Sequence, residues 1–116
     1  MTLRILIVED DPLVAMMLEG YLEALGMETV GCAESVERAL TYIGEEAFDA
    51  AIVDVHLASG ETSSPIAMAL GAADRPFVVT TGSGMSDDSA YEGAPLLAKP
   101  FSLRSLEAAL ALLKMK

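Results

Sequence analysis

Four short apolar runs of the chain end in side chains that could carry chemistry. Glu9-Asp10 follows the first run and Asp54 ends the second, while Thr81 and Lys99 stand at the ends of two later runs. Carboxylates are the ligands that hard divalent cations prefer, and a carboxylate can also act as a nucleophile. These residues can form one site only if the fold brings the ends of the four runs together.

Each of these residues also has a purely structural interpretation. Asp54 could begin a turn, and Glu9-Asp10 could favour the N-terminus of a following helix through its dipole. Thr81 could be a β-branched core residue, and Lys99 a solvated charge in a turn. If all four structural interpretations were correct, four unrelated features would have to fall at one edge of one sheet by chance. A shared functional site is therefore the stronger hypothesis.

The run before Asp54 indicates how the chain is built. Ala50-Ala51-Ile52-Val53 is a continuous stretch of small and branched apolar residues, which is typical of a parallel strand buried on both faces. We expect strands at 3–8, 28–33, 50–54, 76–81 and 95–98, and helices at 12–25, 36–44, 65–71 and 103–113. Asp11, Ser35 and Ser102 are the expected N-caps, and Gly26 is the expected stop of the first helix.

The segment 82–93 shows little periodicity and predicts at most one or two helical turns around 87–92. Its apolar residues are Met85, Ala90 and Tyr91, which we judge too few to anchor it firmly. Elsewhere strands alternate with helices, which predicts an α/β, doubly wound, five-stranded parallel sheet with helices on both faces. In a sheet ordered 2-1-3-4-5, Glu9-Asp10 and Asp54 converge, and Thr81 and Lys99 close the other side.

Composition narrows the class of protein. The 116 residues fit one domain, 1–116, and the longest apolar stretches, 13–18 and 108–113, are far shorter than the roughly 20 residues of a membrane helix. No secretory signal is visible, so we expect a cytoplasmic protein without membrane contact. Cys32 is the only cysteine and is expected in the core. The net charge of −11 argues against direct binding of nucleic acid.

Four motifs of the chain resemble those of the receiver domain of two-component response regulators. They are Ile5-Leu6-Ile7-Val8-Glu9-Asp10-Asp11, Val53-Asp54-Val55-His56-Leu57, Thr80-Thr81-Gly82 and Lys99-Pro100-Phe101, and they span the whole chain in order. The resemblance implies a flavodoxin-like fold with Mg²⁺ as cofactor and Asp54 as the phosphoacceptor. It implies Asp10 as a direct metal ligand, Glu9 as a ligand through water and the main-chain carbonyl of His56 as a third ligand. Thr81 and Lys99 would contact the phosphoryl group.

Several departures from the usual receiver sequence resemble the FATGUY-type receivers, whose fourth helix is short. Ala58 stands where most receivers have proline, and Leu96 stands where an aromatic residue is common. The chain between Thr81 and Lys99 is also shorter than usual, so we expect a fourth helix that is short or disordered. The subgroup's own motif is incomplete, because Gly84 replaces its tyrosine. The resemblance implies a histidine kinase of HWE type, or a phosphotransfer protein, as partner.

The leading hypothesis is a single-domain response regulator, a monomer or weak dimer, that signals by protein contact or drains phosphate from a kinase. Its catalysis would be limited to its own phosphorylation at Asp54 and its own dephosphorylation. A pseudo-receiver that binds partners regardless of phosphorylation is an alternative, although the intact acidic and basic residues argue against it. A flavodoxin-like cofactor binder is disfavoured, since no phosphate-cradling loop follows the first strand and no Trp could stack on a flavin.

Overall fold

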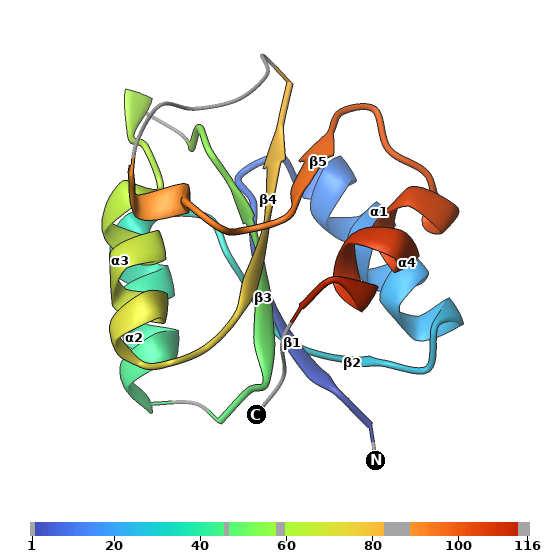
Figure 1. Cartoon of the computed structure of the whole chain (residues 1–116), viewed down its shortest axis with the longest axis horizontal. Helices are drawn as coiled ribbons and strands as arrows, with labels where there is room; N and C mark the ends of the chain where they lie inside the picture. The colour runs from blue at the N-terminus through green and yellow to red at the C-terminus, as the bar shows by residue number, and fades with distance from the viewer. Residues whose placement is uncertain (1, 46, 58–59, 83–88, 114–116) are drawn as a thin grey trace.

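The computed structural model describes residues 2–45, 47–57, 60–82 and 89–113. Strands and helices alternate along this part of the chain (Figure 1). The strands are β1 (Arg4–Val8), β2 (Glu28–Ala33), β3 (Ala50–Asp54), β4 (Phe77–Thr81) and β5 (Leu96–Ala98). The helices are α1 (Pro12–Ala24), α2 (Val36–Glu45), α3 (Ser64–Ala72) and α4 (Leu103–Ala111), with the 3-10 turn η2 (Ser89–Tyr91).

The five strands form one parallel sheet in the order β2-β1-β3-β4-β5, as expected. Successive residues of β1 point to opposite faces, so Ile5 and Ile7 join one buried cluster and Leu6 and Val8 join another. The helices α1 and α4 cover the first face, and α2 and α3 cover the second (Figure 1). This doubly wound arrangement leaves the carboxyl ends of the strands together at one edge.

The expected helix caps are confirmed. The Asp11 carboxylate accepts a hydrogen bond from Leu13 N at 2.9 Å, and the Ser35 hydroxyl accepts one from Arg38 N at 3.1 Å. Ser102 accepts from Ser105 N at 3.1 Å and begins α4. Each cap satisfies an amide that has no partner within its own helix, so the starts of α1, α2 and α4 are fixed by their local sequence.

Two parts of the sequence-based picture are refined by the structure. Met17, Leu40 and Leu103 recur with other apolar residues at the three- and four-residue spacing of a helix face, but they are 37%, 40% and 36% exposed. Three- and four-residue spacing identifies the apolar face of a helix. Residues at the edge of that face are buried only where another element of the fold packs against them. Between β4 and β5 the described residues contain a single helical turn, η2, in agreement with a short fourth helix. The positions 83–88 of that segment lie outside the described residues.

No helix in the described ranges combines the length and apolar character needed to cross a lipid bilayer.

Candidate functional site

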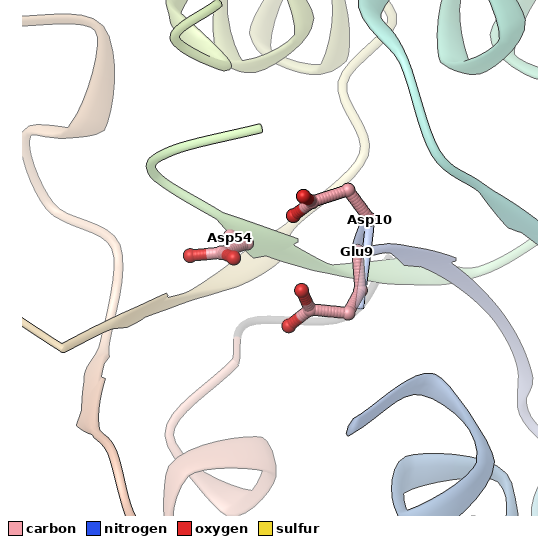
Figure 2. A group of neighbouring side chains, drawn as sticks. All are labelled: Glu9, Asp10 and Asp54. Carbon is pink, nitrogen blue, oxygen red and sulfur yellow. The ribbon is translucent and has the colours of Figure 1, made fainter. Parts of the chain in front are cut away.

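The ends of β1 and β3 bring three carboxylates together. Val8 pairs with Val53 in the sheet, so Glu9 and Asp10 emerge beside Asp54, the last residue of β3. One carboxylate oxygen from each of the three lies within 4.8 Å of the others. Figure 2 shows Glu9 and Asp10 on opposite sides of the end of β1, both turned towards Asp54. The predicted convergence of these residues is therefore confirmed.

Two of the three carboxylates are buried, and the third is partly exposed to solvent. Glu9 is 3% exposed and Asp54 is 5% exposed, whereas Asp10 is only partly buried. The main chain holds Glu9 in place, because its amide donates to Ala33 O at 2.9 Å and its carboxylate accepts from Asp11 N at 3.1 Å. A donor set of buried carboxylates with one more accessible member suits a hard divalent cation that enters from solvent.

Lys99 joins the same cluster from the end of β5. Its ammonium donates to Glu9 Oε1 and to Asp54 Oδ2, each at 3.0 Å. Its main-chain amide donates to Thr81 O at 2.8 Å, which fixes the start of the side chain against the end of β4. One ammonium among three carboxylates leaves an excess of negative charge, which a bound cation would reduce.

Burial and ion pairing shift the titration of two of these groups. Burial raises the pKa of Glu9, and the hydrogen bonds from Lys99 and from Asp11 N offset only part of that shift. Burial alone would lower the pKa of Lys99, but its hydrogen bonds to Asp54 and Glu9 outweigh this effect and raise it. Lys99 is therefore a stable cation at neutral pH, while the Glu9 carboxylate carries an energetic cost of burial.

Thr81 and His56 lie at the same edge of the sheet. Thr81 is the last residue of β4 and is 1% exposed, and its neighbour Thr80 pairs with Asp54. His56 follows β3, is exposed, and forms an isolated antiparallel bridge with Thr62 through its main chain. Among the described residues, the carboxylate cluster does not include the His56 ring.

Cys32 differs from its expected place in the core. It is only partly buried, and its thiol donates a hydrogen bond to Glu19 Oε1 at 2.9 Å. Burial and this bond raise the pKa of Cys32 to about 12. The thiol is therefore protonated at neutral pH and is a poor nucleophile. It packs against the margin of the first core cluster and is only partly enclosed there, because β2 is an edge strand of the sheet.

Comparison with known proteins identifies the family. The model of the response regulator receiver domain matches residues 5–111. The chain belongs to the response regulator receiver family.

Solved receivers support this assignment. The solution structure of SdrG from Sphingomonas melonis Fr1 is 47% identical, covers 96% of this chain and 95% of its own, and superposes with a TM-score of 0.86. The receiver domain of PhyR from Erythrobacter litoralis is 26% identical; the match covers 95% of this chain and 88% of that domain, with a TM-score of 0.80.

A sequence relative is the transcriptional regulatory protein MalR of Bacillus subtilis (strain 168), which is 28% identical over 94% of this chain. The receiver spans only 49% of the length of MalR.

Two residues of this receiver gain a role that the sequence did not reveal. Ser63 is completely buried, and its hydroxyl lies 2.9 Å from the Tyr91 hydroxyl. Tyr91 is 8% exposed, so it anchors η2 more firmly than its sparse apolar neighbours suggested. The only sequence signal was an aromatic residue in a segment poor in apolar side chains, and nothing local identifies its distant partner.

Proposed function

We propose that this receiver accepts a phosphoryl group on Asp54 from a histidine kinase or phosphotransfer protein, in a reaction that requires Mg²⁺. The observation that carries the proposal is the buried arrangement of Asp54 beside Glu9 and Asp10, with the Lys99 ammonium 3.0 Å from Asp54 Oδ2. A structural salt bridge needs one carboxylate for each ammonium, whereas this cluster assembles three carboxylates. Such an excess of buried negative charge is costly unless a cation binds it.

The residues present fit Mg²⁺. Asp10 and Asp54 would hold it directly, Glu9 through water, and His56 through its main-chain carbonyl. Mg²⁺ suits a site of this kind because it binds few carboxylates and keeps several water ligands. When bound, it supplies positive charge for the carboxylates and for the phosphoryl oxygens. The exposed side of Asp10 leaves a path for the ion and its waters.

The proposed transfer is a substitution at phosphorus. An oxygen of the Asp54 carboxylate forms a bond to the phosphorus of a phosphohistidine, and the phosphorus–nitrogen bond breaks. The bonding electron pair returns to the imidazole nitrogen of the donor. Lys99 and Thr81 lie at the ends of the neighbouring strands, where an ammonium and a hydroxyl can donate to the oxygens of the transferred group. In dephosphorylation, water attacks phosphorus and the Asp54 carboxylate leaves.

The output we propose is contact with another protein, or removal of phosphate from a kinase of HWE type. SdrG, a structural relative that is 49% identical in this comparison, has a BeF3-activated conformation. This supports the use of beryllofluoride as a phosphoryl mimic here. Direct DNA binding is not part of the proposal, because the net charge is −11 and the match to MalR covers only part of that regulator. We place the exchange in the cytoplasm and expect a monomer or weak dimer.

Intact-mass measurement after incubation with acetyl phosphate and Mg²⁺ tests the proposal. We expect the mass of one phosphoryl group in the wild type, and none in Asp54→Asn or without Mg²⁺. Asp49→Asn is a matched control, because Asp49 precedes the same strand at its opposite end and accepts a bond from Arg4 N. An unmodified wild type that still binds its partner would support the pseudo-receiver instead.

A further inference from the structure

The chain that follows Asp54 folds back on itself. Ser63 N donates to Val55 O at 2.9 Å, and Leu57 N donates to Glu61 O at 2.8 Å. Between these two bonds, His56 and Thr62 form an antiparallel bridge. The main chain of 55–57 is therefore held by that of 61–63, so the position of the His56 carbonyl depends on where 61–63 are placed.

The position of 61–63 is in turn fixed by a distant side chain. The Ser63 hydroxyl lies 2.9 Å from the Tyr91 hydroxyl, although the two residues are 28 positions apart. Both side chains are buried, with exposed fractions of 0% and 8%. A buried hydroxyl that loses its partner remains unsatisfied, so this pair favours one arrangement of the two segments over others.

Tyr91 also shares a buried cluster with the residue next to Asp54. Its side chain belongs to a buried cluster with Val55, Ala67 and Val79, which brings η2 together with α3, β4 and the residue that follows β3. Figure 1 shows η2 lying against α3, where the Ser63 bond places it. Val55 thus lies in the same buried cluster as Tyr91, and its main-chain carbonyl accepts the hydrogen bond from Ser63 N. Two separate routes lead from Tyr91 to the chain beside the acidic site.

We propose that the Ser63–Tyr91 hydroxyl pair is a positioning device for the metal site, which holds the 55–57 main chain in the arrangement that binds Mg²⁺. This inference rests on the proposed function. Affinity falls in proportion to the fraction of molecules in the binding-competent arrangement, so loss of the pair weakens Mg²⁺ binding. Because coupling between two sites is reciprocal, Mg²⁺ bound near Asp54 also stabilises η2.

Titration of the full chain with Mg²⁺, followed by calorimetry or NMR, tests the pair. We expect Tyr91→Phe and Ser63→Ala each to raise the Mg²⁺ dissociation constant by about 5-fold or more, the lower end of typical coupling. The double variant should bind Mg²⁺ no more weakly than the single variant with the larger dissociation constant, because both changes remove the same hydrogen bond. Tyr42→Phe is the matched control. It removes a phenolic hydroxyl from α2, where the ring lies under Arg38, and should leave the dissociation constant unchanged.

The melting temperature without metal separates positioning from general stability. A lower melting temperature with an unchanged Mg²⁺ dissociation constant in Tyr91→Phe and Ser63→Ala would overturn the inference. If either variant does not fold, amide exchange in the wild type decides. We expect Mg²⁺ to slow exchange at residues 89–93, and equal rates with and without Mg²⁺ would also overturn it.

The same titration distinguishes this inference from the proposed function. A wild type that does not bind Mg²⁺, or binds it as well after Asp10→Asn, contradicts the ligand set and with it the proposed function. Binding that Asp10→Asn abolishes and Tyr91→Phe leaves unchanged contradicts only the role of the hydroxyl pair.

Discussion

The two faces of the sheet are covered by different kinds of elements. On one face, α1 and α4 pack two full helices against the strands, with Leu18, Leu22 and Leu106 almost completely buried. On the other, α2 and α3 cover β1 and β3, and the described cover over β4 comes from α3 together with the 3-10 turn η2. Among the described contacts of that turn, Tyr91 packs in a buried cluster with Val55, Ala67 and Val79, and its hydroxyl pairs with the Ser63 hydroxyl.

A hollow of about 370 Å³ marks the thinner region. It lies between α3, η2 and the end of α4, and small residues such as Ala67 and Ala94 line it together with Phe77. Segments with few buried contacts open at a lower free energy than the core around them. The comparison teaches that the two faces differ in what covers them near β4 and β5: a full helix, α4, on one face, and the short turn η2 beside α3 on the other.

Truncating one buried side chain in each region should expose this difference. Leu106→Ala should lower the free energy of unfolding by about 2–5 kcal/mol, because Leu106 is completely buried in the thicker region. Tyr91→Ala should lower it by less than Leu106→Ala does, since we expect η2 to open without the rest of the sheet. Urea denaturation measures both values.

Amide hydrogen exchange shows which residues lose stability in each of the two variants. Tyr91→Ala should accelerate exchange at residues 89–93 while β1 and β3 keep their protection, whereas Leu106→Ala should accelerate exchange throughout the sheet. Equal losses of stability with the same exchange pattern in both variants would show that the two regions form one cooperative unit.

The acidic site lies at the sheet edge that both regions share, and Mg²⁺ should stabilise the fold through it. At a concentration ten times its dissociation constant, Mg²⁺ should add about 1.4 kcal/mol and raise the melting temperature by about 5 °C. Asp10→Asn should remove most of this rise. Glu34→Gln is the control, since Glu34 lines the hollow beside Asp10 but stands outside the carboxylate cluster. An unchanged response in Asp10→Asn would contradict the proposed ligand set.

Glu9→Gln should produce the smallest effect, and one that depends on pH. Because the folded pKa of Glu9 is raised above its ordinary value of 4.5, the favourable contribution of this group is complete below pH 4.5 and is lost as pH rises through the folded pKa. Without metal, the stability of Glu9→Gln relative to the wild type should therefore increase from pH 4.5 towards neutrality. Denaturation with chelator across this range measures the difference, and a constant difference would mean that burial does not dominate at Glu9.

The sequence alone determined the elements and the place of the site. Runs such as Ala50–Asp54 identify buried strands because a continuous stretch of small and branched apolar residues is typical of a parallel strand covered on both faces. Caps such as Asp11 and Ser102 are local as well, since each bonds an amide two or three residues away. Once the strands are parallel, their carboxyl ends share one edge, so the meeting of Glu9, Asp10 and Asp54 could be predicted from topology.

Only the tertiary structure decided which distant side chains bond. Lys99 lies between Glu9 and Asp54, 90 and 45 positions away, and Ser63 meets Tyr91 across 28. It also decided that Cys32 stands at the margin of the sheet and that Tyr91 is buried. Hydrophobic periodicity and helix caps predict only the local conformation of the chain. The contacts between distant side chains depend on how helices and loops pack over the sheet edge. The physical reason is that a buried polar group takes whichever partner packing brings within reach.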